Sequence, residues 1–203
     1  MYTSLRAASR TVSQFLLGRL LADPSLGPMF NVGGSLQVSL LSPEQMVAVP
    51  IQGLSVWMYR VVRDEETLNA PDVRTKAGLL TPPPLPLRAH YLITPITDVK
   101  TPAGTELEQV ILGKVLQSLY DRTTLKGADL QDDFLGTDTV LNLRLEPLNL
   151  QELYEIWDAL DVSYRLSVSY EVSVLNIDAA VGPTPITPVF GIVPEYAQII
   201  GGP

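Results

Sequence analysis

The sequence predicts an α+β fold with a single mixed or antiparallel β-sheet, about three packed helices and an extended, proline-rich C-terminal tail. Three segments carry apolar residues at helical spacing, one long segment alternates apolar and polar residues, and prolines gather in a loop and in the tail. The 203 residues are enough for one domain with a substantial core. We assign residues 1–178 to this domain and residues 179–203 to the tail.

The first predicted element is an amphipathic helix over about residues 4–22. Its apolar residues recur every three or four positions and therefore form one face. Three short strands are then expected, at 36–41, more weakly at 46–51, and at 54–62. The third has apolar side chains on both sides, which is typical of a strand covered on both faces.

Residues 64–89 have the composition of a loop, with a cluster of prolines near its end that favours an extended conformation. A strand is predicted at 90–94. The helix that follows, at about 105–120, is expected to begin with a capping box in which Thr105 is the N-cap and Glu108 the third helical residue.

A strand at 139–145 and a helix at 150–160 follow, the helix again preceded by the capping pair Asn149 and Glu152. The longest strand signal covers 164–177, with six apolar residues on one side and five polar residues on the other. This pattern predicts a half-exposed antiparallel strand, which we place at the centre of the sheet. The three helices are expected to cover its apolar face.

Charge and composition exclude several classes of protein. The net charge is −8, and residues 121–203 hold 13 acidic and 4 basic residues, so a nucleic-acid partner is not expected. No stretch is apolar for long enough to span a membrane, and no secretory signal is visible, so we expect no membrane insertion and a cytoplasmic chain. Cysteine is absent and only 18% of residues are charged, which suggests apolar surface meant for other subunits.

Motifs for catalysis or cofactor binding are missing. We find no nucleophile elbow, Walker loop or dinucleotide-binding fingerprint. The single histidine, His90, lies in an apolar run, which favours a structural or interface role over a role as base or metal ligand. The aspartates of 129–138 do not have the spacing of an EF-hand, so a solvated loop is favoured over a weak cation site. We predict no enzyme activity, no metal site and no cofactor.

Other residues point to contacts with partners. Trp157 lies on the apolar stripe of its helix, which favours the core, whereas Trp57 suits a core or an interface equally. Arg165 and Glu171 share the polar side of one strand but are too far apart to pair with each other. Each is expected to meet a cross-strand partner or a neighbouring subunit. Eight large apolar residues in the tail indicate that it lies across its own domain or a neighbour.

Several stretches across residues 5–178 carry, in order, a family resemblance. They are Val56-Trp57-Met58-Tyr59-Arg60-Val61-Val62, Asn69-Ala70-Pro71, Pro84-Leu85-Pro86-Leu87-Arg88-Ala89-His90-Tyr91-Leu92-Ile93-Thr94, residues 106–120, and 145–153 through Trp157 to 164–172. Together they resemble the cap, or tail-terminator, proteins of extracellular contractile injection systems, phage-tail-like particles such as the Photorhabdus virulence cassettes and antifeeding prophages. Leu68-Asn69 departs from the Arg-Asn pair expected there. Many relatives have a second C-terminal domain, whose function is not carried over.

The resemblance implies a structural protein that forms a homo-hexameric ring. This ring would bind the last layer of the inner tube protein and the contractile sheath protein and end their polymerisation at the distal end. The particle would be assembled in the cytoplasm and then released or anchored to a membrane. The alternatives are another adaptor of the same particle, such as a baseplate or tube-joining protein, or a ligand-binding module or enzyme. The interface candidates are Trp57, Asn69, Pro71, His90, Tyr91, Arg165, Glu171, Phe190, Ile192 and Tyr196.

The tail has a composition suited to closing open strand edges. An extended apolar segment can pair with the edge of a sheet, and its prolines prevent a further strand from pairing with it. One hypothesis is that it closes the last row of sheath strands. Deletion of residues 182–203 would then leave a folded protein that no longer caps sheath.

Overall fold

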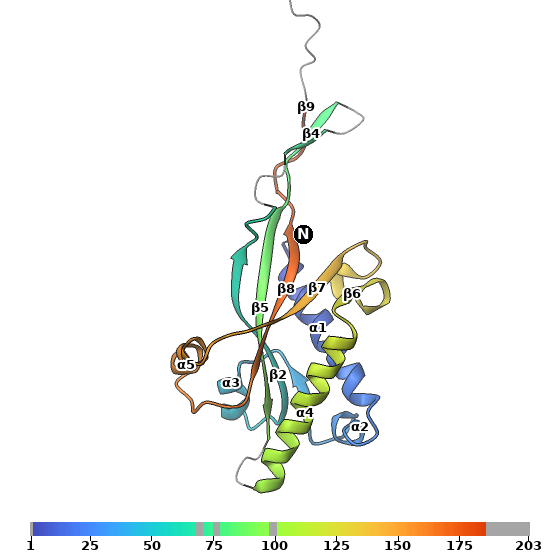
Figure 1. The fold of residues 1–203 in the computed structure, drawn as a ribbon. Helices are drawn as coiled ribbons and strands as arrows, with labels where there is room; N and C mark the ends of the chain where they lie inside the picture. Colours follow the sequence, from blue (N-terminus) through green and yellow to red (C-terminus); the bar gives the residue numbers. More distant parts are fainter. Residues whose placement is uncertain (1, 68–70, 75–77, 98–100, 186–203) are drawn as a thin grey trace, which may run out of the picture. The chain divides into compact units, whose positions relative to one another are not determined.

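The structure of the chain is a computed structural model that forms two compact units (Figure 1). It describes residues 2–67, 71–74, 78–97 and 101–185. The main unit consists of Met1–Asn69 and Pro84–Asp178, and the small unit consists of Ala70–Pro83 and Ala179–Pro203. Among the described residues, no helix is both long enough and apolar enough to span a membrane.

The main unit is built on a mixed six-stranded sheet. Its order is β1 (Gln37–Ser39), β2 (Gly53–Arg63), β5 (Leu85–Ile96), β8 (Val168–Ile177), β7 (Val140–Glu146) and β6 (Thr124–Lys126). Only β1 and β2 are parallel, and all other pairs are antiparallel. The α+β class is therefore confirmed, and β8 is central, as predicted, although it begins four residues later than the apolar alternation suggested.

Helices cover both faces of the sheet, with α1 (Ser4–Leu21) and α4 (Pro102–Asp121) on one and α5 (Leu150–Ala159) on the other (Figure 1). The main core joins α1, α4 and the strands, and includes Tyr91 of β5. The next residue, Leu92, points to the opposite face and packs with Trp157 of α5. The expectation that all three helices share one face is therefore wrong.

The segment expected as a weak strand at 46–51 instead contains a short helix, α3 (Pro43–Ala48). The Ser42 hydroxyl accepts a hydrogen bond from the N–H of Gln45, whose side chain accepts one from the N–H of Ser42. Pro43 occupies the first helical position, where its missing N–H costs nothing. These local helix signals outweigh the β-branched residues that suggested a strand. Another short helix, α2 (Gly27–Phe30), precedes it.

The N-cap of helix α4 lies four residues earlier than predicted, at Thr101 and not at Thr105. The Thr101 hydroxyl accepts a hydrogen bond from the N–H of Gly104, and Pro102 follows as the first helical residue. Glu108 therefore lies in the second turn, where it is buried and binds other partners.

The predicted loop at 64–89 is only partly a loop. Strand β5 begins at Leu85, and the small unit contains a three-stranded antiparallel sheet. Its order is β3 (Val73–Arg74), β4 (Leu79–Thr81) and β9 (Thr184–Pro185). These strands are two or three residues long, too short for a periodicity of two to be read from sequence.

The acidic loop folds into two 3₁₀ turns, η1 (Gly127–Asp129) and η2 (Asp132–Phe134). Asp129, Asp132 and Asp133 form ion pairs and are not simply solvated. Arg6 Nε lies 2.7 Å from Asp132, and Arg122 lies 2.7 Å from Asp129. These contacts fasten the loop to α1 and to the end of α4.

Candidate functional site

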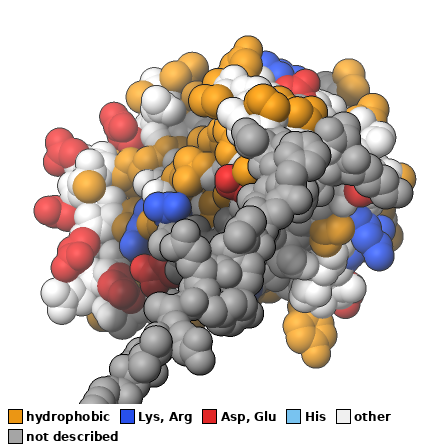
Figure 2. Space-filling view, turned by 90° about the horizontal axis from the view of Figure 1, so that it is seen from above, with side chains coloured by type: hydrophobic (Ala, Val, Ile, Leu, Met, Phe, Trp, Pro, Cys, Tyr) orange, Lys and Arg blue, Asp and Glu red, His pale blue; other side chains and the backbone are white. Residues whose placement is uncertain are grey.

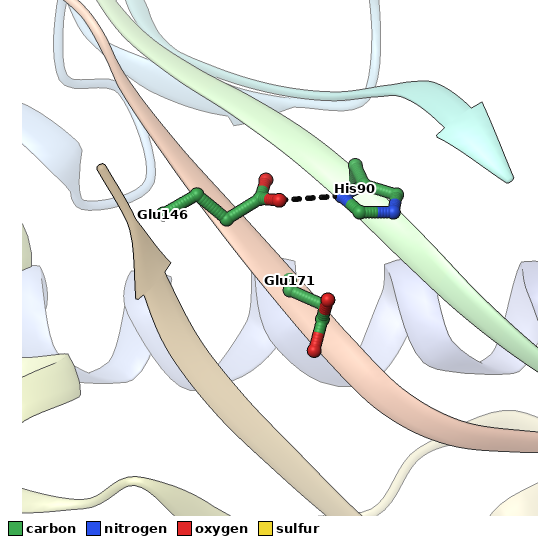
Figure 3. A group of neighbouring side chains, drawn as sticks. All are labelled: His90, Glu146 and Glu171. Carbon is green, nitrogen blue, oxygen red and sulfur yellow. Dashed lines mark hydrogen bonds and ion pairs between the residues drawn. The ribbon is translucent and has the colours of Figure 1, made fainter. Parts of the chain in front are cut away.

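A polar cluster lies on the α5 face of the sheet, where three strands run side by side (Figure 3). It is formed by His90 of β5, Glu171 of β8 and Glu146 at the end of β7. His90 and Glu171 are direct cross-strand neighbours and are both buried. The Nδ1 atom of His90 lies 2.8 Å from Oε1 of Glu146. The alternation of apolar and polar residues correctly predicts that Glu171 lies on the polar side of its strand. The exposure predicted for that side is wrong at Glu171, which is buried.

Hydroxyl groups complete the surroundings of Glu146. The Ser169 hydroxyl donates to Oε2 of Glu146 at 2.6 Å, and the Tyr59 hydroxyl lies 3.0 Å from the Ser169 oxygen. Burial raises the pKa of Tyr59, so its hydroxyl stays protonated at neutral pH. The Tyr59 hydroxyl also donates to Oε2 of Glu146 at 3.5 Å, so this carboxylate has hydrogen-bonding partners from three other strands, β2, β5 and β8.

Arg88 of β5 connects this cluster to the loop that follows β2. Its guanidinium pairs with Asp64 and with Glu66, and lies 3.6 Å from Glu171. Asp64 is almost fully buried, whereas Glu66 is mostly exposed. On the other side, Arg144 of β7 lies 3.5 Å from Glu171. The expectation that Glu171 meets cross-strand partners is confirmed.

The pKa of Asp64 predicts a specific dependence of stability on pH. The Thr67 hydroxyl and the Arg88 guanidinium hold this pKa below its usual value. The ionised carboxylate of Asp64 therefore stabilises the folded chain fully above the unfolded-state pKa of about 3.9. This stabilisation is lost as the pH falls through the lower folded-state pKa. We expect Asp64→Asn to lower the free energy of unfolding at pH 7. The difference in free energy between the two proteins should become smaller as the pH falls towards 2.5. Urea denaturation of both proteins across this range measures the difference, with Glu66→Gln as the exposed control.

The His90, Glu146 and Glu171 cluster has the chemistry of a metal site, which sequence reasoning missed. One potential ligand atom from each residue lies within 4.8 Å of the others. However, Glu171 faces the guanidinium groups of Arg88 and Arg144, whose positive charge opposes a cation. In the structure these residues take part in a network of hydrogen bonds and ion pairs, which supports a structural role for His90.

A second buried ion pair joins α4 to the segment before β8. Arg165 lies 3.3 Å from Glu108, which also accepts hydrogen bonds from the N–H and hydroxyl of Thr97 at 3.1 Å each. Glu108 is buried and the side chain of Arg165 is 21% exposed. Arg165 therefore has a partner within its own chain.

The remaining interface candidates lie in different places. Tyr91 is fully buried in the main core, and its hydroxyl lies 3.0 Å from that of Ser9. Trp57 is half-buried and packs against the apolar cluster of Leu92, Trp157 and Leu160, whereas Pro71 is exposed in the small unit. Four candidates lie outside the described residues: Asn69, Phe190, Ile192 and Tyr196.

Exposed apolar side chains support the expectation of surface meant for partners. Figure 2 shows hydrophobic side chains on the molecular surface, with acidic side chains gathered at the left of the view. An apolar groove of about 610 Å³ lies between the end of α4 and strand β7. Tyr120 and Leu145 line it and are 84% and 50% exposed.

Sequence comparison places most of the chain in one family. Residues 7–190 match the family model described as the Pvc16 N-terminal domain. A direct comparison with curated protein sequences gives no match.

Two solved structures share the fold. One is a cryo-EM structure of an extracellular contractile injection system, the PVC sheath/tube terminator in the extended state. It is 19% identical, has a TM-score of 0.53, and the match covers 94% of this chain and 64% of that one. The other is the cryo-EM structure of the anti-feeding prophage cap, a tube-terminating cap. It is 20% identical, has a TM-score of 0.58, and the match covers 91% of this chain and 60% of that one.

This chain thus spans about three fifths of the length of each of these proteins. At these identities the likeness establishes the fold. Because the family model matches nearly the whole sequence, the chain belongs to the Pvc16 N-terminal domain family.

Proposed function

We propose that the chain is a structural cap protein of a phage-tail-like contractile injection particle, and not an enzyme. Six copies would form a ring on the last layer of tube and sheath and end polymerisation at the distal end. The observation that carries the proposal is the family match over residues 7–190. The shared fold with a sheath/tube terminator and a tube-terminating cap supports it.

Features of the main unit agree with a structural role. The most developed polar cluster is held by ion pairs with Arg88 and Arg144, which leaves its carboxylates engaged. The surface exposes large apolar side chains, including Tyr120 and Leu145, that another subunit could cover. A closed ring needs a head-to-tail contact that returns on itself, and such a contact requires two different surfaces on each copy.

Native mass spectrometry and negative-stain electron microscopy of the purified chain test the ring. We expect a mass of six copies and a ring-shaped particle. A stable monomer that also fails to assemble on preformed tube and sheath would count against the proposal. Labelling of the chain in whole particles distinguishes a cap from a baseplate adaptor, because a cap labels only the end distal to the baseplate.

The charge of the second half of the chain predicts a salt-sensitive attachment. Residues 121–203 hold 13 acidic and 4 basic residues, and Glu155 and Asp158 are exposed on α5. If these residues face a basic partner surface, binding to particle ends should weaken several-fold between 50 and 500 mM NaCl, because salt screens exposed charges. Co-sedimentation with tube and sheath at several salt concentrations measures this. Glu155→Gln combined with Asp158→Asn should flatten the dependence, and binding unaffected by salt would instead indicate apolar docking.

A further inference from the structure

The outer side of strand β2 is an open sheet edge over most of its length. Strand β1 pairs only with Gly53–Ser55, whereas β5 pairs with β2 as far as Arg63. In the part of the chain that the structure describes, no strand pairs with the outer side of β2 beyond Ser55 (Figure 1). Such an edge offers unpaired N–H and C=O groups to another chain.

The register identifies the backbone groups that point outward. The N–H of Asp64 donates to the carbonyl oxygen of Pro86, so these two residues form a hydrogen-bonded pair. Hydrogen-bonded and non-hydrogen-bonded pairs alternate along an antiparallel ladder. Arg63 with Leu87 and Val61 with Ala89 are therefore pairs without hydrogen bonds. The N–H and C=O groups of Val61 and Arg63 point away from β5, towards the open side.

Two cavities lie beside this edge, on the face that carries α5. The first, of about 430 Å³, is lined by Trp57 and Tyr59 of β2 and by Ile156 of α5. The second, of about 710 Å³, is lined by Arg60, Arg63 and His90 together with acidic residues and Arg88. An added strand binds through its backbone and gains specificity from pockets for its alternate side chains.

The second cavity contains groups that still lack partners. Arg60 and Arg63 are exposed and form no ion pair with any residue in the described ranges. The Nε2 atom of His90 is buried without a hydrogen-bond partner there. These groups favour an incoming segment that carries an acidic side chain.

We propose that this edge binds the C-terminal tail of a second copy of the chain, residues 186–203, as an added β-strand. The tail contains apolar residues, including Phe190 and Ile192, followed by its one charged residue, Glu195. The same order occurs along β2, where Trp57 precedes the two arginines. A tail strand parallel to β2 would bring apolar side chains to the aromatic cavity and Glu195 to the arginines.

This contact joins two different surfaces, a tail and an edge, and is therefore head-to-tail. Repeated around an axis, it closes into a ring. The inference rests on the self-assembly in the proposed function and specifies how neighbouring copies bind. It assigns the tail to a neighbouring copy of the same chain and not to the sheath.

Engineered cysteines test the contact cleanly, because the chain has no cysteine of its own. Two differently tagged copies of the chain are expressed together, one with Val61→Cys and the other with Phe190→Cys, Ile192→Cys or Tyr196→Cys in the tail. We expect a disulfide-linked heterodimer for at least one tail position. Val32→Cys, at a fully exposed site, replaces Val61→Cys in the control and should give at least tenfold less product. Product no greater than the control at all three positions overturns the proposal.

The same variants decide which chain the tail joins. With both cysteines in one copy, a cross-link confined within monomers would show that the tail binds its own β2, which contradicts the proposal. Cross-linking of the tail to sheath but not to a second copy would also overturn it. Because capping of particles is scored separately, rings that form without this cross-link would remove the inference and leave the proposed function standing.

Two further variants test the backbone and the charges. Arg63→Pro in the copy that carries Val61→Cys removes an outward N–H without breaking a bond to β5, so it should abolish cross-linking while circular dichroism remains unchanged. Arg60→Glu with Arg63→Glu should lower the cross-linked yield at least tenfold. Adding Glu195→Arg to that variant should restore it, an outcome that general destabilisation would not produce. A charge-reversed edge that cross-links as well as the original would contradict the charge pairing and with it the register proposed here.

Discussion

Arg88→Ala is expected to lower the free energy of unfolding by about 3 to 5 kcal/mol, because it removes the partner of carboxylates buried in the protein. Asp64 is 1% exposed, and Glu171 is 9% exposed by side chain. Without Arg88, Asp64 keeps the Thr67 hydroxyl and Glu171 keeps the guanidinium of Arg144, but the ion pair to Asp64 is lost. Urea denaturation at pH 7, followed by circular dichroism, measures the change.

The matched control for Arg88 is Arg6, which also pairs with two carboxylates but is 53% exposed. Surface ion pairs contribute about 0 to 1 kcal/mol, so Arg6→Ala should have a much smaller effect. Equal effects of the two substitutions would contradict the view that the network around Arg88 is a buried structural unit.

Trp157→Ala is expected to destabilise the chain by about 3 to 5 kcal/mol, the usual cost of removing a large aromatic side chain from a core. Trp157 is 2% exposed and packs with Leu92 of β5 and Leu160 at the end of α5. Since these residues hold α5 on the sheet, we expect the helix to detach before the rest unfolds. Hydrogen exchange of α5 amides, compared with those of β8, detects this local loss.

Leu150→Ala, on the same helix, is the control for Trp157. Leu150 is 65% exposed, so its truncation should change the free energy of unfolding by less than about 0.5 kcal/mol. If Trp157→Ala were as mild as Leu150→Ala, and instead reduced assembly, Trp157 would be an interface residue and its assignment to the core would be wrong.

Local periodicity predicted the elements whose signals lie within one segment. The spacing of apolar residues located α1, and the cap formed by Asn149 and Glu152 located α5. The spacing of Thr105 and Glu108 predicted the wrong start for α4, because a threonine and a glutamate three residues apart also occur inside a helix. Thr101 followed by Pro102 was the stronger start signal.

The features that depend on strand order could not be predicted. The alternation in β8 identified Glu171 as polar, but its burial depends on Arg88 and Arg144 from the two neighbouring strands. Side chains of β2 do pack on both faces of the sheet, as its two apolar sides predicted, but no local pattern indicates that its outer edge is open. Which strands are neighbours is decided by packing between distant segments, which no local pattern records.

Cryo-electron microscopy of whole particles carrying a labelled copy of the chain tests the central claim most directly. We expect the label only at the end distal to the baseplate, in a ring of six copies in contact with the last layer of tube and sheath. Particles made without the chain should have tubes and sheaths of uneven length. Label along the shaft or at the baseplate, or particles of normal length and closure without the chain, would contradict the proposed cap.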